Sequence, residues 1–424
     1  MCITKNGRRA LAGRQGKILL SLTLVFGTLL AFGGLAIDMG RVEFFRRRIQ
    51  TAADAGAIGG VRELQVNGST NIVTAARDDS KVNGYENGVN GATVTVDFPP
   101  ATGPHAGDNR YLEVVVAKPY PMTFMKVVKL NTVTLKARAV GGLGPSDYCI
   151  IALNPAASGA INVAGNTNVQ VLGCSVMDDS NNATSLTVTG NSSCLTAKSI
   201  DVVGNYSSGS GNGNGCPSPP LQPTPKIGAT YVYDPLAYLS APTFGGCDQT
   251  DYSTNKTVTL NPGVYCGGIK ISGNNNTVTF NPGTYVLLGG GLQTSGGGTV
   301  QGTGVTFYST GDSTYAFDDF KLNGNTTFNW AAPTSGTYEG ILYFQDRSKA
   351  GSSQGNVING TNASSFNGVF YAAGGKFTYT GNSAATGYTG IIADTITFTG
   401  NSTLRSNYST LTNGNPVRNG ALME

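Results

Sequence analysis

The chain has 424 residues, of which 12% are charged, 39% are hydrophobic and 60 are glycine. Charged residues are about half as frequent, and glycine about twice as frequent, as in an average globular protein. The first 66 residues hold ten Lys or Arg and four acids, which gives them a net charge of +6. Because the whole chain has a net charge of +4, the remaining residues carry −2. A nucleic-acid-binding protein needs a basic face on its folded part, and this distribution excludes that class.

A transmembrane helix is predicted over residues 18–37, ILLSLTLVFGTLLAFGGLAI, which carry no charge. As a helix this segment is about 30 Å long, which matches the hydrocarbon core of a bilayer. A secretory signal peptide cleaved after Ala36 is the alternative, but its hydrophobic part is about 7–15 residues long. We therefore expect a basic cytoplasmic stub over 1–17, which includes Cys2, and a retained anchor.

The helix is predicted to continue outside the membrane over residues 38–66. No proline precedes Pro99, and hydrophobic positions recur at helical spacing from Val42 onward. A stripe of small residues, which lets another backbone approach closely, runs along this part of the helix at Ala52, Gly56 and Gly60. The stripe contacts either a partner protein or this chain's own next domain, and the sequence leaves both open.

Residues 16–60 resemble the N-terminal segment of the TadG-like proteins, which belong to the bacterial Tad, or Flp-pilus, assembly system. The resemblance rests on a glycine before the hydrophobic run, on AIDMG and on IQTAADAGAIGG. Ile49 and Gly56 are mild departures from the family pattern. A processed type IV pilin carries Glu at the fifth position after its cleavage Gly, where this chain has Ser21, so cleavage is not expected. The family-motif positions are Gly16, Asp38, Gly40, Gln50, Ala52, Ala53 and Asp54.

A small α+β head, pilin-like in its succession of a long helix and a sheet, is predicted over residues 67–142. Alternating hydrophobicity indicates strands over 92–98, 111–119 and 131–140. Residues 122–128 are interpreted as a short helix or an edge segment. GGLGPSD, at 141–147, marks the boundary to the next domain.

A β-repeat domain is predicted over residues 148–413, followed by a tail over 414–424. LNPGVY at 260–265 and FNPGTY at 280–285 are offset by 20 residues, a period typical of solenoids. We predict a right-handed β-helix, with an irregular β-sandwich as the alternative and 207–226 as a Gly/Pro-rich excursion. Equivalent Asn residues at stacked corners would hydrogen-bond to each other. A Gly-Asn corner motif, suited to positive φ, recurs at Gly165, Gly190, Gly204, Gly273, Gly324, Gly381 and Gly400.

Six cysteines follow the hydrophobic segment and form no C-x-x-C metal pattern. Disulfides in an oxidising compartment are favoured over free buried thiols, and disulfides would place the C-terminal bulk outside the cytoplasm. Of 15 connectivities, we predict pairing between neighbours along the chain. These pairs are Cys149–Cys174, Cys194–Cys216 and Cys247–Cys266.

An enzyme is the alternative that the β-helix raises, because many β-helices degrade polysaccharides. Glycoside hydrolysis needs two carboxyl groups about 5–10 Å apart, and residues 148–413 contain a single Glu, Glu339. The nearest candidates are Asp178-Asp179, Asp318-Asp319 and the pair Asp346-Arg347. His105 is the only histidine, which excludes a His-rich metal site. We expect no catalysis, no cofactor and no metal.

The sequence thus predicts a structural protein of a Tad/Flp-type pilus assembly or secretion apparatus. The resemblance implies the inner membrane and other pilus-assembly proteins as partners, with the N-terminus in the cytoplasm and the bulk in the periplasm or outside. Adhesion to a cell-surface or glycan target is a further expectation. The alternative is a membrane-tethered, β-helical carbohydrate-active enzyme.

Overall fold

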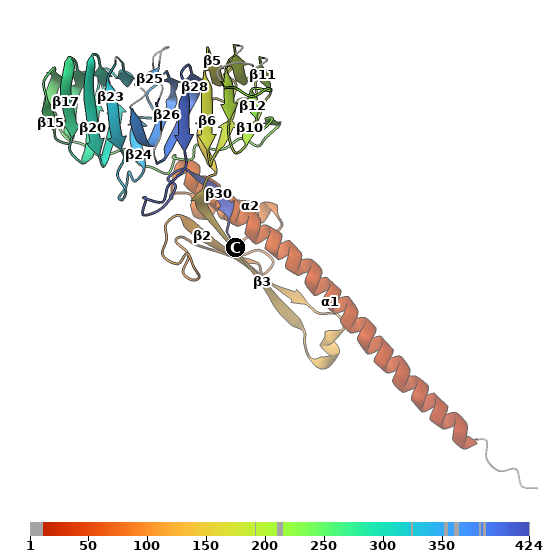
Figure 1. Ribbon diagram of the computed structural model, residues 1–424. Coiled ribbons are helices and arrows are strands. Elements are labelled where there is room, and N and C mark those ends of the chain that lie inside the picture. Colours follow the sequence, from red (N-terminus) through yellow and green to blue (C-terminus); the bar gives the residue numbers. More distant parts are fainter. Residues whose placement is uncertain are drawn as a thin grey trace, which may run out of the picture. The chain divides into compact units, whose positions relative to one another are not determined.

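The computed structural model describes residues 12–190, 192–209, 215–323, 325–351, 355–359, 364–380, 383–384 and 387–423, with side chains from Leu19 onward except at 383–384. The chain forms two compact units (Figure 1). One contains residues 1–143 and 420–424, and the other contains 144–419.

The first unit is built on one long helix, α1 (Ala12–Asn67), which includes both the predicted span and its polar continuation. A second helix, α2 (Ile72–Val82), packs on α1. The sheet beside them has the order β1-β2-β3-β30, with β1 (Thr93–Asp97), β2 (Tyr111–Pro121), β3 (Thr132–Pro145) and β30 (Arg418–Leu422). β1, β2 and β3 pair antiparallel and lie where alternation predicts strands.

The segment between β2 and β3 contains a 3-10 helix, η1 (Met125–Val128). This agrees with the short helix that the sequence allows at residues 122–128. We call residues 122–130 the hairpin tip.

Residues 420–424 are part of the first unit, whereas the sequence analysis leaves 414–424 as a tail. In β30, the backbone N–H of Gly420 donates to Gln65 Oε1 at 3.2 Å. Directly after β30, the backbone N–H of Met423 donates to Val140 O at 2.8 Å. A Cβ at position 420 would lie 2.7 Å from Val61 Cγ1, so the strand approaches α1 closely. The repeat unit is therefore an insertion between β3 and β30 of the head.

The repeat unit is a stack of parallel strands in three ladders. The first ladder runs β14 (Gln249–Thr254), β16 (Gly263–Ile271), β18 (Gly283–Leu288), β21 (Val305–Thr310), β24 (Ile341–Gln345), β26 (Ser365–Tyr379), β28 (Thr389–Phe398), β4 (Tyr148–Ala152), β7 (Ser175–Asp178), β10 (Ile200–Val202) and β13 (Lys226–Ile227).

The second ladder runs β14, β16, β19 (Leu292–Thr294), β22 (Lys321–Leu322), β25 (Asn356–Ile358), β26, β28, β5 (Ile161–Ala164), β8 (Leu186–Thr189) and β11 (Tyr206–Ser208). The third is in two parts. One is β15 (Val258–Leu260), β17 (Asn274–Phe280), β20 (Gly297–Thr303), β23 (Thr327–Ala331) and β26; the other is β27 (Ser383–Ala384), β29 (Ser402–Arg405), β6 (Asn168–Leu172), β9 (Cys194–Thr196) and β12 (Leu221–Gln222).

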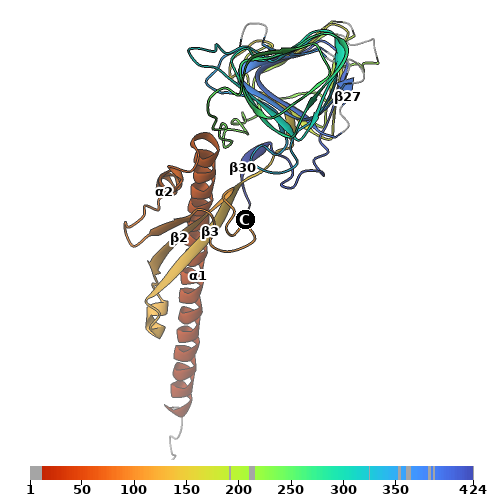
Figure 2. The ribbon, with the colours of Figure 1, turned by 90° about the vertical axis from the view of Figure 1, so that its left-hand side faces the viewer.

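The long strands β16, β26 and β28 each pair in two ladders, so the sheet closes on itself. Eight strands form a closed circuit of parallel pairs: β16, β18, β21, β24, β26, β25, β22 and β19. In Figure 2 the strands of this unit overlie one another in a closed outline. Parallel pairing does not fit the alternative, an irregular β-sandwich, because sandwiches are built from antiparallel strands.

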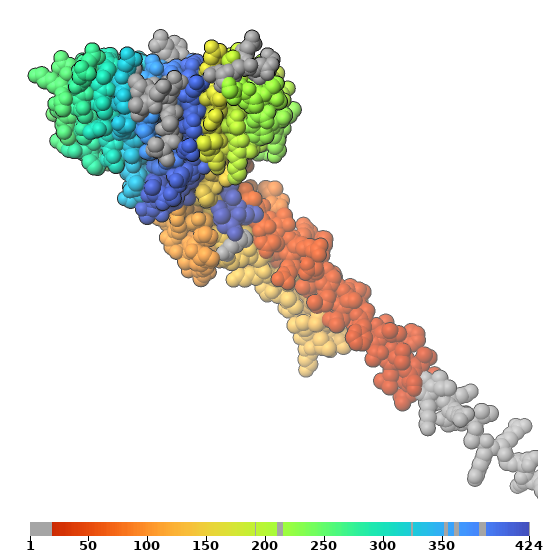
Figure 3. All heavy atoms as spheres, viewed as in Figure 1, coloured from red at the N-terminus to blue at the C-terminus, as the bar shows by residue number. Residues whose placement is uncertain are grey.

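The order of strands in the stack differs from their order in the chain. From β4 the chain proceeds through β7 and β10 to β13 at one end, and it starts again at β14 at the other end. It then advances to β28, which pairs with β4. Figure 3 shows this junction as dark blue atoms, near residue 390, beside yellow ones from residues 150–170.

The interior of the stack is a column of large hydrophobic side chains at register positions. Tyr285, Phe307, Tyr343, Phe370 and Ile391 follow one another in the first ladder and are buried. The neighbouring residues on the same strands face the other way and are buried in a second cluster, together with Leu236 and Leu239. Burial on both faces explains why these strands are nearly all hydrophobic, as in other parallel sheets.

The corners confirm the predicted stacking of Asn residues in one case. Asn281 Nδ2 donates to Asn261 Oδ1 at 2.8 Å, which joins the two NPG motifs. At a Gly-Asn corner, Gly190 has φ of 108° and a Cβ there would lie 2.7 Å from Gly165 O. Glycine is required at position 190 because its φ is in the left-handed region and because the stacked corner at Gly165 leaves no room for a side chain.

Short strands occur within residues 207–226, the range for which the Gly and Pro content predicts an excursion from the solenoid. β11, β12 and β13 lie within or overlap this range and pair with β8, β9 and β10. Strands of two or three residues fit between prolines because only those few residues must join the ladder. Residues 210–214 lie outside the described part of the chain.

All three predicted disulfides are confirmed. Their Cα–Cα distances are 5.9 Å for Cys149–Cys174, 5.5 Å for Cys194–Cys216 and 5.7 Å for Cys247–Cys266. Each closes a short loop within the repeat unit, and such a cross-link stabilises a fold by about 2–4 kcal/mol. Cys2 lies outside the described residues.

Candidate membrane anchor and surface cavity

The N-terminal part of α1 exposes an uninterrupted hydrophobic surface. Every Leu, Val, Ile and Phe from Leu19 to Ile37 is at least 40% exposed. This is the one helix among the described residues that is long and apolar enough to cross a membrane, with a mean hydropathy of 2.1. Such a surface is stable against lipid and not against water, so this part of α1 is a candidate membrane anchor.

Asp38 ends the hydrophobic surface and is bound by the hairpin tip. Its carboxylate accepts the backbone N–H groups of Thr123 at 3.0 Å and of Phe124 and Met125 at 2.8 Å each. Arg41, one turn further along α1, donates to Thr123 Oγ1. A carboxylate that receives several N–H groups is strongly held, so Asp38 fastens the tip to the helix as well as marking the end of the apolar run.

The polar half of α1 is built into the head by the family-motif residues. Gln50 Nε2 donates to Asp54 Oδ1 at 2.7 Å and to the backbone oxygen of Arg138 in β3 at 3.2 Å. Ala52 and Ala53 are fully buried. Gly16 lies in α1, and Gly40 is exposed, with no atom within 4 Å of a Cβ built there.

The small-residue stripe, Ala52, Gly56 and Gly60, packs within the first unit. Ser80 Oγ in α2 donates to Ala52 O at 3.0 Å. A Cβ added at Gly56 would lie 2.4 Å from that Ser80 Oγ, and one at Gly60 would lie 2.9 Å from Leu112 Cδ1 in β2. Of the two contacts that the sequence leaves open, the structure places the stripe against this chain's own α2 and β2.

Comparison with known proteins bears on helix α1. Residues 16–63 match the family model described as putative Flp pilus-assembly TadE/G-like. We call residues 16–63 the TadE/G-like segment. No curated protein and no solved structure matches the chain.

The TadE/G-like segment lies entirely within α1. It begins just before the apolar surface, includes Asp38, Gln50 and Asp54, and ends beyond the contacts of Gly60. It therefore covers both the candidate membrane anchor and the surface on which the head is assembled.

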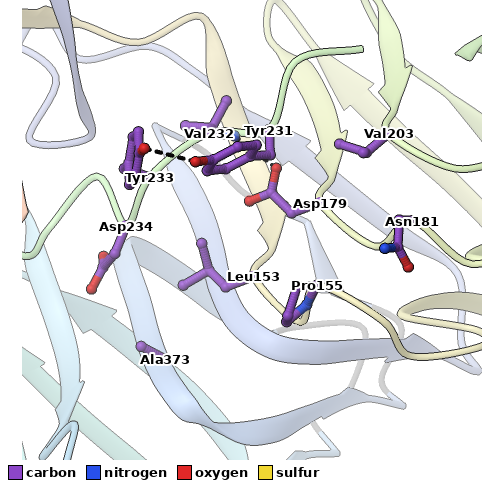
Figure 4. Close-up of a pocket in the computed structure, with 10 residues that line it drawn as sticks. All are labelled: Leu153, Pro155, Asp179, Asn181, Val203, Tyr231, Val232, Tyr233, Asp234 and Ala373. Carbon is purple, nitrogen blue, oxygen red and sulfur yellow. Dashed lines mark hydrogen bonds between the residues drawn. The ribbon is translucent and has the colours of Figure 1, made fainter. Parts of the chain in front are cut away.

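The repeat unit has a surface cavity of about 490 Å³ beneath the segment that returns from one end of the stack to the other (Figure 4). We call residues 228–247 the return segment. The hydroxyl groups of Tyr231 and Tyr233, both in this segment, form a hydrogen bond of 2.7 Å. The cavity is lined by Leu153, Pro155, Asp179, Asn181, Val203, Tyr231, Val232, Tyr233, Asp234 and Ala373.

Asp179, which lines this cavity, and its neighbour Asp178 are both buried. Burial raises the pKa of Asp178 and that of Asp179 to about 7, although each accepts a backbone N–H. Asp179 Oδ1 accepts the N–H of Val232 at 2.8 Å, which ties the return segment to the stack. Asp178 Oδ2 has no hydrogen-bond partner among the described residues.

The second anchor of the return segment is Arg347, which the sequence analysis paired with Asp346. Arg347 Nη1 donates to Leu239 O at 3.0 Å, and Nε lies 3.4 Å from Asp234 Oδ2. Arg347 also donates to Leu236 O and Tyr371 Oη. The return segment forms no strand, and the hydrogen bonds from the guanidinium group hold it to the stack instead.

Asp346, Asp318 and Glu339, three of the acids considered for catalysis, each hydrogen-bond or ion-pair within the fold. Partial burial would raise the pKa of Asp346, but hydrogen bonds from Thr310 and Ser348 outweigh it and lower that pKa. Asp318 binds Lys321 at 2.7 Å. Glu339 accepts the backbone N–H of Asn413 at 2.6 Å. His105 stacks on Tyr111 in the first unit.

Among the described residues, no three or more His, Cys, Asp or Glu side chains are grouped to hold a metal ion. Two features were missed by sequence reasoning: the return segment and the contact between Asp38 and the hairpin tip. Arg347 offered a signal for the first, because a basic residue two positions after a hydrophobic strand needs a partner. The second had no signal, because its donors are backbone groups.

Proposed function

We propose that this protein is a membrane-anchored structural component of a Tad/Flp-type pilus assembly or secretion apparatus. It holds the repeat unit outside the inner membrane, with its N-terminus in the cytoplasm. The observation that carries the proposal is the match of residues 16–63 to the TadE/G-like family on the helix with the exposed hydrophobic surface. The disulfides add support for export, because they persist in oxidising compartments.

The proposed partners are the other assembly proteins of a Tad/Flp system. Deletion of the gene in a piliated host is expected to abolish or shorten the pili, and the wild-type gene restores them. A variant that keeps residues 68–424 behind an unrelated transmembrane helix is expected not to restore piliation, although it is exported. Full restoration by that variant would show that the TadE/G-like segment is only an anchor.

We further propose that the coils of the repeat unit form a right-handed β-helix. The support is that neighbouring coils pair in parallel, and connections between parallel strands are right-handed in nearly all folds because strands twist one way.

Adhesion through the cavity is the second part of the proposal. Tyrosine rings, a side-chain amide and carboxyl groups, here Tyr231, Tyr233, Asn181 and Asp179, are chemistry that suits a sugar. A glycan-array experiment with the detergent-solubilised protein tests it. Tyr231→Ala is expected to lose binding and Tyr206→Ala, outside the cavity, to retain it. Glycan cleavage that Asp179→Asn abolishes would instead favour the enzyme.

A further inference from the structure

We propose that the hairpin tip, residues 122–130, is a second membrane contact that places hydrophobic side chains in the lipid interface beside α1. The inference rests on the proposed membrane anchor and adds to it a second, non-helical insertion. Its occupant is the bilayer in which α1 is embedded.

The hairpin tip exposes a group of hydrophobic side chains. Val127 is 89% exposed, Val128 is 70%, Phe124 is 46% and Leu130 is 37%. Single exposed hydrophobic residues are ordinary on a soluble surface, but a contiguous group marks an interaction site. We therefore expect residues 122–130, MTFMKVVKL, to contact an apolar environment.

The position of the hairpin tip along α1 indicates that this environment is lipid. Three backbone N–H groups of the tip bind Asp38, which directly follows the apolar surface. The Phe124 ring lies even closer to the membrane side, since a Cβ at Gly34 would be 2.7 Å from its Cγ. Gly34 precedes Asp38 by four residues, or about 6 Å along a helix. The ring thus lies at the level of the hydrophobic span. Figure 1 shows the short helix between β2 and β3 beside α1.

The charge around the hairpin tip suits an anionic lipid surface. Lys126 and Lys129 are exposed and stand among the hydrophobic residues of the tip. No acid occurs between Val114 and Ser146, so both arms of the hairpin are basic. Lysine and arginine beside a transmembrane segment are attracted to anionic headgroups, and long lysine chains reach them from an apolar position.

A tryptophan placed on the hairpin tip tests the inference. The full chain is reconstituted into vesicles of phosphatidylethanolamine and phosphatidylglycerol that carry brominated acyl chains, which quench tryptophan on contact. Val127→Trp and Val128→Trp are compared with Val82→Trp, a site on α2 that is 83% exposed. The wild-type chain, whose only tryptophan is the buried Trp330, supplies the blank.

The added fluorescence of both tip variants is expected to be blue-shifted and mostly lost on brominated lipid, and that of Val82→Trp to stay unquenched. Two variants are used so that misfolding of one does not decide the result. If the chain floats with the vesicles and both tip variants behave like Val82→Trp, the second contact is overturned and the anchor stands. If the wild-type chain does not float with the vesicles, the anchor itself fails and the inference fails with it.

Discussion

Ile391 in β28 is the parallel neighbour of Ile150 in β4, so the last long strand of the repeat unit stacks on the first. Both side chains are fully buried. The chain therefore closes its stack in the middle, where strands from the end of the repeat unit pair with strands from its beginning. The junction is expected to make the repeat unit one cooperative unit despite its modular strands.

Truncation at this junction tests that cooperativity. Ile391→Ala and Ile150→Ala are each expected to lower the free energy of unfolding by about 2–5 kcal/mol, because each leaves a cavity. The double variant is expected to lose less than the sum, since the residues touch. Denaturant unfolding of the detergent-solubilised chain measures this, with the exposed Thr259→Ala as control. Separate transitions for the two sides of the junction would contradict the account.

The buried carboxyl groups make the stability of the repeat unit depend on pH. Burial raises the pKa of Asp178 and Asp179 to about 7 from 3.8. Between these values the folded protein keeps protons that the unfolded chain has released, so stability is highest below about pH 4 for these groups. It falls as pH rises from about 4 to 7 and is level above that.

Asp178→Asn is expected to make the repeat unit more stable at pH 8 and the pH dependence shallower. The gain has an upper limit of about 4 kcal/mol, from 1.36 kcal/mol per unit of pKa. Thermal unfolding from pH 4 to 8 measures it, and the exposed Asp147→Asn is the control. A variant that is less stable than the wild type at pH 8 would show that the ionised carboxylate is favoured instead.

Arg347 is expected to hold the return segment in place. Arg347→Ala removes donors to Leu239 O and Asp234 and leaves their acceptors half-buried, so the return segment is expected to open. Arg347→Lys is expected to restore little, because lysine lacks the planar fork of donors. Limited proteolysis within residues 228–247 detects the opening, and Lys270→Ala on the exposed face of β16 is the control. Equal cleavage rates in Arg347→Ala and the wild type would contradict this role.

The head depends on glycine where α1 meets α2. Gly56→Ala is expected to destabilise it by about 1–3 kcal/mol, because a Cβ there would lie 2.8 Å from Ala76 O. Gly40→Ala, where a Cβ meets nothing, is the matched control and is expected to gain about 0.5–1 kcal/mol of helix stability. Hydrogen exchange of the α2 amides reports both. Loss of protection in Gly40→Ala alone would contradict this packing.

The features that follow from local patterns were predicted, and those that depend on distant contacts were not. The anchor, the strands of the head and the parallel stacking follow from hydrophobic periodicity and repeat spacing. The disulfides between chain neighbours follow from short loops. The place of β30 in the head was missed, because it depends on contacts of Gly420 with Gln65 and Val61, which are far away in the sequence. The residues of β30 have no pattern of their own that predicts these contacts.

The site was predicted less fully than the fold. Gln50, Asp54 and the small-residue stripe were singled out, but their contacts lie within the head. Arg347 was noticed as a neighbour of Asp346, whereas its partners come from the return segment. Such pairs cannot be read from spacing, since the chain between them crosses the whole stack.

The position of Cys2 and of the disulfides across the membrane tests the central claim most directly. Intact and permeabilised cells are treated with a membrane-impermeant maleimide, and the modified cysteines are mapped without reduction. We predict that Cys2 reacts only after permeabilisation and that the other six cysteines are bridged in the neighbour pairs. Labelling of Cys2 in intact cells, or six free thiols that react only after permeabilisation, would contradict an exported repeat unit on a cytoplasmic N-terminus.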